Sequence, residues 1–298
     1  MKILFCNDPF DVKRPNAAYL KEAEAAQKAG LSYELFSFEA LLQENSAALA
    51  GLPQLDTEET VVYRGWMLKP EQYTRLYNML LAKGWRLINT PDQYKHCHYL
   101  PESYSIIEYH TPLTTWLKTG AEIPILAVHE ILRQFDSLPI IIKDFVKSQK
   151  HYWHEAFFIP SAGDRESAEK VIRRFIELQG EDLNEGIVFR EFVEFESIGT
   201  HSKSKMPLTL EYRIFWLDGE PVCQAPYWEE GTYTSAAPPV EQFQKVAKEV
   251  QSRFLTMDIA KRRNGEWMII ELGDGQVAGL PENADVEAFY KVLAAFPA

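Results

Sequence analysis

The pattern of apolar and polar positions divides the chain into two parts. In the first part, short apolar runs alternate with stretches whose apolar residues recur at helical spacing. This pattern predicts strands at 2–6, 32–38, 60–64 and 86–89, and helices at 17–30, 38–50 and 70–84. Strands that alternate with helices favour a small parallel sheet flanked by helices, which we expect to end at about residue 92.

After residue 92 the predicted strands and helices are segregated rather than alternating. Strands are predicted at 138–146, 156–159 and 186–195, and helices at 115–120, 127–135, 165–179 and 240–255. A hairpin is predicted over 210–226, around the Asp-Gly pair at 218–219, and a polar loop at 198–207. Segregated elements of this kind favour the α+β class for this part of the chain.

An Asn-Gly pair at 264–265 lies between two β-rich segments, which is the strongest short-range signal for a hairpin. A two-residue turn there would make Arg263 face Glu266. Counting outward from that turn, Asp258 would then face Glu271. Directly opposed residues share one face of the ribbon, with Cβ atoms roughly 5 Å apart. We therefore expect these two carboxylates to lie side by side.

Two neighbouring carboxylates repel each other unless a cation lies between them. Carboxylates together with phosphate oxygens are ligands that Mg²⁺ takes. Asp274 follows Glu271 in a Gly-Asp-Gly turn and could bring a third carboxylate to the same place. An exposed acidic edge is the plainer interpretation of Asp258 and Glu271, but the apolar residues around them favour a buried pair that needs a partner.

The composition excludes several classes of protein. The formal net charge of −12 speaks against a general nucleic-acid binder or a protein that binds anionic membranes. Three widely spaced cysteines indicate neither a disulfide framework nor a zinc ribbon, so reduced thiols and a cytoplasmic location are expected. The sequence start does not resemble a signal peptide, and no apolar run is long enough for a membrane span.

Lys143 lies inside the apolar strand predicted at 138–146. Burial there would remove water from its ammonium group, and an anion beside the group would be needed to offset that cost. Lys147 and Lys150 follow on the adjoining loop, so this part of an acidic chain favours a phosphate site. The alternative is a lysine that reaches solvent from an edge strand, beside an ordinary surface loop. Neither a GxxxxGK[ST] nor a GxGxxG motif is present.

Arg213 lies at the centre of the predicted hairpin 210–226, where an arginine needs a partner. Glu211 on the same face is the structural candidate, and a phosphate or carboxylate is the functional one. The strand 186–195 could likewise be only core, or could offer backbone groups to a base. The adjacent residues 96–98 (His-Cys-His) diverge around a helix and cannot easily share a metal ion.

In this order the features resemble the ATP-grasp superfamily, and more narrowly its R2K clade. Four motifs carry the resemblance: Tyr-Arg-Gly-Trp at 63–66, the lysine-rich run 143–151, Glu-Tyr-Arg at 211–213 and the run 271–277. The resemblance covers roughly residues 60–281. It implies an α+β ATP-grasp fold with an N-terminal α/β pre-grasp domain at 1–92. Subdomains would follow at 93–185, with the lysine strand and lid loop, and at 186–298, with the hinge and both hairpins.

The resemblance also implies that ATP and Mg²⁺ bind, and it assigns roles to individual residues. Phosphates would be contacted by Lys95, Lys143, Lys147 and Lys150, the last two standing in for a glycine-rich lid. Glu191 and Val193 would bracket adenine, Glu194 or Glu196 would hold the ribose, and Arg213 would contact the transferred phosphate. Asp258 and Glu271 would bind Mg²⁺. Many members have Asn two residues after the metal-binding Glu, whereas this chain has Gly273, which Asp274 could replace.

The implied activity is that of a carboxylate–amine ligase that forms an acyl phosphate, with Arg213, Lys143 and Lys150 as catalytic residues. Arg64, His201, Tyr227 and Trp228 are candidates for the acceptor side. The substrates would be small-molecule or peptide carboxylates and amines, whose identity the sequence leaves open. The alternative is a non-catalytic nucleotide-binding module for regulation or interaction. A covalent nucleotidyl-transferring ligase is disfavoured, because no Lys-x-Asp-Gly motif includes Lys143.

Overall fold

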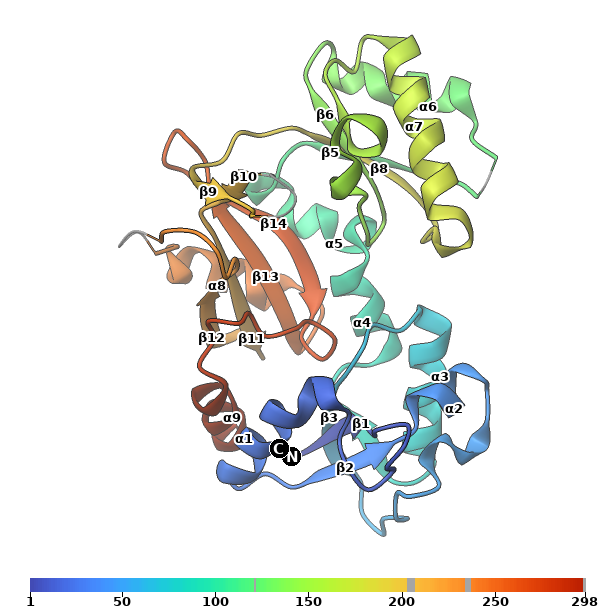
Figure 1. The fold of residues 1–298 in the computed structure, drawn as a ribbon, viewed down its shortest axis with the longest axis vertical. Helices are drawn as coiled ribbons and strands as arrows, with labels where there is room; N and C mark the ends of the chain where they lie inside the picture. The colour runs from blue at the N-terminus through green and yellow to red at the C-terminus, as the bar shows by residue number, and fades with distance from the viewer. Residues whose placement is uncertain (121, 203–206, 234–236, 297–298) are drawn as a thin grey trace.

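The computed structural model describes residues 1–298 except 121, 203–206, 234–236 and 297–298. Three four-stranded sheets and a two-stranded ribbon organise these described residues. The blue N-terminal sheet lies at the bottom of Figure 1, the orange C-terminal sheet beside its centre, and the green middle sheet at the top. Single helical turns occur at Ala17–Tyr19, Ser46–Leu49, Glu108–His110, Arg133–Phe135, Lys150–Tyr152, Trp153–Phe157 and Gly180–Asp182.

The N-terminal sheet is parallel, as the alternating pattern predicts. Its strand order is β2 (Tyr33–Phe36), β1 (Lys2–Cys6), β3 (Glu59–Arg64) and β4 (Trp85–Leu87). The crossover helices are α1 (Leu20–Lys28), α2 (Phe38–Leu42) and α3 (Pro70–Leu81). Both faces of this sheet are buried, which explains why its strands read as continuous apolar runs.

Two consecutive helices connect the N-terminal sheet to the rest of the chain. Helix α4 (Pro91–His98) begins with a capping box at Thr90 and with proline in its first turn. Helix α5 (Leu100–Ile107) follows after a break at Tyr99, whose backbone is extended. The C-terminal end of α4 is thereby brought against the C-terminal sheet, near β14.

The middle sheet is antiparallel. Its order is β5 (Thr114–Lys118), β8 (Gly186–Glu191), β6 (Ile140–Asp144) and β7 (Phe158–Ile159). Helices α6 (Ile125–Leu132) and α7 (Arg165–Gln179) cover one face. The other face carries alternate residues of β6 and β8 toward the C-terminal sheet, and these include Lys143 and Arg190.

Two predictions for this region need correction. Residues 115–120, predicted as a helix, form most of strand β5, because their β-branched and aromatic side chains pair with β8 along its whole length. The second concerns the expected subdomain boundary between 185 and 186. It would divide the middle sheet, since β8 pairs with both β5 and β6.

The C-terminal sheet is also antiparallel, with the order β12 (Glu220–Pro226), β11 (Glu211–Leu217), β13 (Phe254–Lys261) and β14 (Trp267–Asp274). Helices α8 (Val240–Glu249) and α9 (Val286–Ala295) lie against it. The helix predicted at 240–255 is too long, because β13 already begins at Phe254. The predicted polar loop at 198–207 overlaps the strands of a two-stranded ribbon, β9 (Ser197–Thr200) and β10 (Pro207–Thr209).

The two faces of the C-terminal sheet differ in chemistry. One face is mainly apolar and packs on α5 and α8, although Asp274 also lies on it, opposite Leu255. On the other face, Phe215 and Phe254 pack against α9 and the N-terminal sheet. Farther along that same face the alternate positions become charged, at Glu211, Arg213 and Asp258. A strand pattern that changes from apolar to charged on one face marks where the sheet leaves the core and meets a cavity.

The hairpin at 264–265 differs in detail from the prediction. Arg262, rather than Arg263, pairs with Glu266, so the turn has three residues. Such a turn alone would shift the register by one position. A β-bulge restores it, because Ile270 has no opposite residue, and Asp258 does face Glu271 as predicted.

Candidate active site

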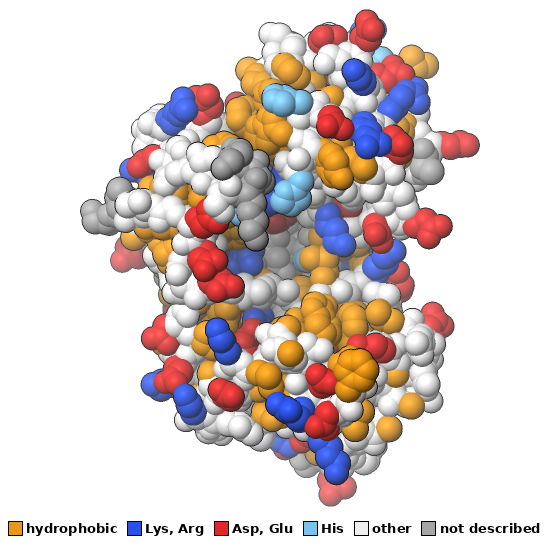
Figure 2. Space-filling view, viewed as in Figure 1, with side chains coloured by type: hydrophobic (Ala, Val, Ile, Leu, Met, Phe, Trp, Pro, Cys, Tyr) orange, Lys and Arg blue, Asp and Glu red, His pale blue; other side chains and the backbone are white. Residues whose placement is uncertain are grey.

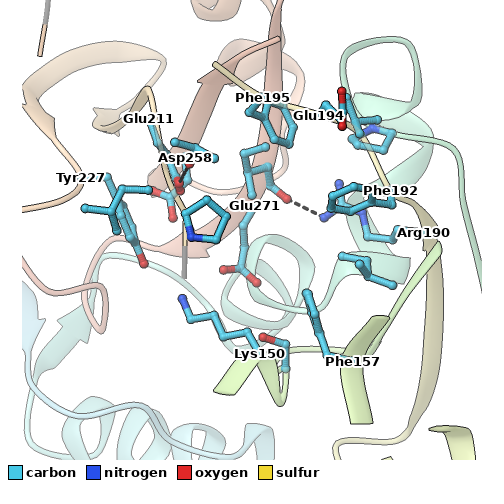
Figure 3. A pocket seen from close by; sticks show the side chains of 18 of the residues that line it. Lys150, Phe157, Arg190, Phe192, Glu194, Phe195, Glu211, Tyr227, Asp258 and Glu271 are labelled. Atoms are coloured by element: carbon cyan, nitrogen blue, oxygen red, sulfur yellow. Dashed lines mark hydrogen bonds between the residues drawn. The ribbon is translucent and has the colours of Figure 1, made fainter. Parts of the chain in front are cut away.

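A cavity of about 380 Å³ lies between the middle and C-terminal sheets. In Figure 3, Glu211, Asp258 and Glu271 line one side and Arg190 and Phe192 the other, while Lys150 and Phe157 approach from the loop after β6. The space-filling view shows the surface hollowed between the upper and lower parts of the molecule, with lysine and arginine side chains beside the hollow (Figure 2).

One end of this cavity is apolar. Side chains from five different segments meet there, namely Ile141, Phe157, Phe192, Leu208 and Ile270. The predicted adenine-bracketing residues Glu191 and Val193 line the same end, at the point where the chain leaves β8. An apolar slot beside an open strand end is suited to a flat heteroaromatic ring.

The other end of the cavity is charged, and two ion pairs lie beside it, of which Lys143, Glu271 and Asp258 line this cavity and Arg213 lines an adjoining one. Lys143 Nζ lies 2.5 Å from Glu271 Oε1. Arg213 donates two hydrogen bonds to Asp258, of 2.8 Å and 2.7 Å, from Nε and Nη2. The partner of Arg213 is therefore Asp258 and not Glu211, the structural alternative, because Asp258 lies directly opposite Arg213 on the neighbouring strand. The predicted phosphate-binding cations and metal-binding carboxylates are adjacent in this structure, and they neutralise each other.

Glu211 nevertheless belongs to the cavity, although it was considered only as a structural partner. It is buried, and Thr209 donates it a hydrogen bond of 3.0 Å. Burial, followed by the negative charge of Asp258, raises the pKa of Glu211 to about 8. A carboxyl group with so high a pKa is suited to meet a cation or to hold a hydroxyl group.

Arg190 is a residue of the cavity that the sequence interpretation missed. It donates hydrogen bonds of 2.7 Å to the Ile270 carbonyl and to Thr111 Oγ1, while its Nε is buried without a partner among the described residues. Burial lowers the pKa of Arg190 to about 10. Like Lys143, Arg190 is a cationic residue within an apolar strand, so the same sequence argument could have identified it.

Tyr227 and Trp228 form an aromatic shelf over the charged end. The Arg213 guanidinium lies 4.9 Å from the Tyr227 ring centre, and Lys150 Nζ lies 5.2 Å from that of Trp228. Both contacts have cation–π geometry. These two residues, predicted for the acceptor side, thus contact the predicted catalytic cations.

The lysine-rich loop is anchored at its start. The backbone N–H groups of Val146 and Lys147 both donate to the Asp144 carboxylate. Lys150 lines the cavity, whereas the described lining does not include Lys147. The structure therefore brings Lys143 and Lys150 to the site and leaves Lys147 beside it.

Other predicted residues are paired elsewhere. Lys95 Nζ lies 2.6 Å from Glu185, away from the cavity. Glu194 lines the cavity, but its carboxylate is bonded to Arg263 at 2.8 Å. Glu196 lies 3.0 Å from Lys261. His201, on the described residues just before 203–206, does not line the cavity.

Arg64 and Asp274 have structural surroundings. Arg64 is buried and is bonded to Glu22 and to the carbonyl oxygens of residues 275, 276 and 278. Asp274 lies opposite Leu255, on the other face of the sheet from Glu271. Its carboxylate accepts hydrogen bonds from Asn89 and from the Gln276 backbone. Asp274 is therefore not brought to the carboxylate pair, which corrects the expectation that it joins a metal site.

A second cavity of about 170 Å³ adjoins the first. Its walls include Met67, His98, Val146, Arg213, Gly273, Val277 and Ala278, and it shares Asp258 and Glu271 with the larger cavity. The two carboxylates thus lie where the cavities meet. At Gly273 an added Cβ would lie 2.8 Å from Thr256 Oγ1, so an Asn side chain at this position would require the Thr256 side chain to shift.

The two carboxylates fit Mg²⁺ only as part of a larger ligand set. No group of three or more His, Cys, Asp or Glu side chains that could hold a metal occurs among the residues described. Mg²⁺ commonly binds through one or two carboxylates together with substrate phosphates and water. Asp258 and Glu271, at the edge of a cavity that contains cations for phosphate, match that arrangement.

The fold and the cavity define this chain as an ATP-grasp protein. Residues 132–293, more than half of the chain, match the family described as the ATP-grasp domain, R2K clade family 3, and the chain belongs to that family. Both the family and the fold class expected from the sequence are confirmed. The comparison with curated proteins gave no match.

Solved structures of the same fold cover nearly the whole chain. D-cycloserine synthetase DcsG is 15% identical, with a TM-score of 0.59 and coverage of 99% of both chains. ATP-grasp ligase PsnB, complexed with a precursor variant, Mg and ADP, is 14% identical (TM-score 0.59; 99% of this chain, 98% of that one). Macrocyclase MdnC from Microcystis aeruginosa MRC, bound to precursor peptide MdnA, is 12% identical, with a TM-score of 0.58 and coverage of 98% of this chain and 99% of that one. These neighbours share the ATP-grasp fold with this chain.

No helix among the described residues is both long enough and apolar enough to cross a bilayer.

Proposed function

We propose that this protein is an ATP- and Mg²⁺-dependent ligase that joins a carboxylate to an amine through an acyl phosphate. The observation that carries the proposal is that two cavities share Asp258 and Glu271. The larger cavity has room and chemistry for a nucleotide, and the smaller one for an acceptor. A phosphoryl group at their junction could pass from one to the other.

Different residues of the larger cavity would contact different parts of ATP. Adenine would lie in the apolar end, beside the backbone of Glu191 and Val193. Lys143, Lys150 and Arg190 would contact the phosphates. Asp258 and Glu271 would hold Mg²⁺, which neutralises charge on the phosphate oxygens when bound. Glu211, beneath the aromatic shelf, would face the ribose or the metal side of the nucleotide.

Binding requires the two ion pairs to exchange partners. Lys143 would move from Glu271 to a phosphate oxygen, and Arg213 from Asp258 to the transferred group. Each cation would then be matched by a phosphate and each carboxylate by the metal. Without nucleotide these groups would therefore be held beside the site in ion pairs, and they would reach the transferred phosphate only when the nucleotide and metal bind.

The acceptor carboxylate would enter the smaller cavity and attack the terminal phosphorus atom of ATP. A carboxylate oxygen forms the new P–O bond as the bond to the ADP oxygen breaks, which gives an acyl phosphate and ADP. An amine then attacks the acyl carbon and phosphate leaves. The neighbours that bind peptide precursors or make a small molecule support either a peptide or a small-molecule substrate.

ADP release tests the proposal. The purified protein with Mg²⁺ and ATP is screened against amino acids, peptides and small carboxylates, each with and without an added amine. For any active carboxylate, ¹⁸O in the carboxyl group should appear in the released phosphate, because one oxygen passes through the acyl phosphate. The variant Glu271→Gln should release no ADP above background.

Two results would contradict this proposal in different ways. ADP release without ¹⁸O transfer would exclude the acyl phosphate but retain an ATP-using enzyme. Tight binding of ATP with no ADP release under any condition would favour the alternative, a nucleotide-binding module for regulation or interaction.

The domain organisation is proposed on the same basis. We infer a pre-grasp domain over 1–92 and a nucleotide cleft between the middle and C-terminal sheets. Strand β8 pairs within the middle sheet, so we propose that the subdomain boundary follows Glu191, at the expected hinge, instead of preceding Gly186.

A further inference from the structure

His98 ends helix α4 and is buried beside the candidate active site. Its ring lies between two tyrosines, with ring centres 5.4 Å from Tyr94 and 6.1 Å from Tyr99. Neither ring nitrogen has a hydrogen-bond partner in the part of the chain that the structure describes. Buried polar atoms are rarely left unpaired, because each one forfeits its hydration. A buried imidazole that contacts two tyrosine rings, with both nitrogens unpaired, indicates that a bound ligand supplies the missing hydrogen bonds.

Two cavities adjoin this ring. The first, of about 10 Å³, is also lined by Ser103, Lys143 and Glu271, and it has room for about one water molecule. Ser103 Oγ is likewise buried and unpaired among the described residues, so one water could serve both side chains. The second is the 170 Å³ cavity that we assign to the acceptor, where His98 lines the wall together with Arg213, Asp258 and Glu271.

We propose that His98 is a phosphate-binding residue, which donates a hydrogen bond to the terminal phosphate of ATP as it is transferred. This inference rests on the proposed function, since it needs a nucleotide in the larger cavity. A neutral imidazole donates from one nitrogen and accepts at the other. One nitrogen would therefore serve the phosphate, and the other would serve the water beside Ser103.

This assignment replaces Lys95 as the contact from helix α4. Lys95 lies on the same helix, but its ammonium group lies 2.6 Å from Glu185 and the residue lines neither cavity. His98 is three residues farther along, on the part of the helix that ends at the site. Removal of the His98 side chain should therefore weaken nucleotide binding, whereas removal of the Lys95 side chain should not.

Calorimetry with three nucleotides tests the role of His98. Affinities of AMP, ADP and a non-hydrolysable ATP analogue are measured with Mg²⁺ for the wild type and for His98→Ala. The ATP analogue should bind about tenfold more weakly to the variant, the loss expected for one hydrogen bond to a charged group. AMP affinity should stay within about twofold. The variant His98→Gln, which keeps a donor, should recover part of the loss.

Two variants of the same helix serve as controls. His96→Ala also removes an imidazole, and Lys95→Met removes the cation first assigned to phosphate. Both should bind the ATP analogue as the wild type does. Equal affinity of wild type and His98→Ala for the analogue would overturn the inference while leaving the proposed function intact. A wild type that binds no adenine nucleotide would overturn both.

A measurement on the unaltered protein covers the case in which His98→Ala does not fold. The ring-nitrogen resonances of the histidines are recorded by ¹⁵N NMR and assigned through His98→Gln. Addition of the ATP analogue with Mg²⁺ should shift the His98 nitrogens, whereas AMP should not. Unchanged His98 resonances at saturating analogue would overturn the inference.

Discussion

The guanidinium group of Arg213 is bonded twice to a buried carboxylate, so removing it does more than remove a phosphate contact. Asp258 would be left buried without its partner, which costs about 3–5 kcal/mol in comparable sites. A substitution that keeps the positive charge is therefore a cleaner test of function than one that removes it. Lysine keeps the charge but loses the planar fork that meets two oxygens at once.

We predict that Arg213→Lys lowers kcat by about 10²-fold, on the scale of a single electrostatic stabiliser of the transition state. The melting temperature should stay close to that of the wild type, and nucleotide affinity should change far less than kcat. Arg213→Met should melt several degrees lower, because Asp258 is unpaired. Steady-state kinetics and thermal melts check this, and a kcat of Arg213→Lys within about twofold of wild type would make Arg213 a structural residue.

Asp274 gives a prediction about pH. Burial raises its pKa to about 6, whereas an unfolded chain has an Asp pKa of about 3.9. The native state thus binds the proton more tightly than the unfolded state. This contribution to stability is complete below about pH 4 and is lost as the pH rises through about 6.

The difference in free energy of unfolding between wild type and Asp274→Asn should therefore change with pH. Relative to the variant, the wild type should lose up to about 3 kcal/mol between pH 4 and pH 7. Urea denaturation of both proteins across this range measures the difference, in which other titrating groups cancel. A difference that does not vary with pH would mean that Asp274 titrates normally.

Single residues also show how far the sequence could predict the site. Asp258, Glu271 and Lys143 are predictable because a charge in an apolar strand needs a partner, and Lys150 because it lies on the basic loop that follows Lys143; the structure brings all four to one cavity. The error over Asp274 had a physical cause. The Gly-Asp-Gly segment is predicted as a turn, whereas strand β14 continues through Asp274, and a strand residue three positions after Glu271 lies on the opposite face of the sheet.

At the scale of elements, the loop after β6 is anchored by Asp144 at its start and by the pairing of β7 with β6 at its end. Asp144 holds the backbone of Val146 and Lys147, while the following turns carry Lys150 and the aromatic residues 152–158 over the cavity. Clustered cations repel one another until an anion arrives. Nucleotide should therefore order the far part of the loop more than its start.

We expect hydrogen exchange over residues 148–158 to slow when ATP analogue and Mg²⁺ are added, with little change at 146–147. The amides at 146–147 should already be protected, because Asp144 accepts hydrogen bonds from both. Asp144→Asn serves as a control, since it should raise exchange at the start of the loop without nucleotide. Unchanged exchange over 148–158 would mean that the loop does not close on the ligand.

Most elements were predictable because their periodicity was long or their turns were distinctive. Helix α7 lies at the predicted bounds, and the hairpin at 218–219 has the predicted turn. The exceptions were short. Strand β5 has only five residues, and a run of that length fits a helix or a strand until its partner is known.

At the scale of the whole molecule, the N-terminal and C-terminal sheets are joined by buried polar contacts. Arg64 bonds the loop after β14, and Asn89 bonds both Phe254 and Asp274. These contacts fix the acceptor cavity between the two sheets. Neither could be read from the sequence, because the residues concerned lie far apart along the chain.

Ligand binding should stabilise the whole molecule only when the metal is present. We predict that ATP raises the melting temperature in Mg²⁺ and much less in EDTA, because binding to the native state alone shifts the unfolding equilibrium. The variant Glu271→Gln should abolish the difference between the two buffers while keeping its own melting transition cooperative. Equal shifts in Mg²⁺ and EDTA would exclude Asp258 and Glu271 as metal ligands.

The three-residue turn and the bulge at Ile270 have a consequence for how this hairpin can vary. Each irregularity alone exchanges the two faces of β14, and only the pair of them leaves Glu271 opposite Asp258. Single-residue insertions and deletions in this segment should therefore be tolerated in matched pairs and rejected singly. A relative with a two-residue turn should lack the bulge, and a length change at one of the two places should be accompanied by one at the other.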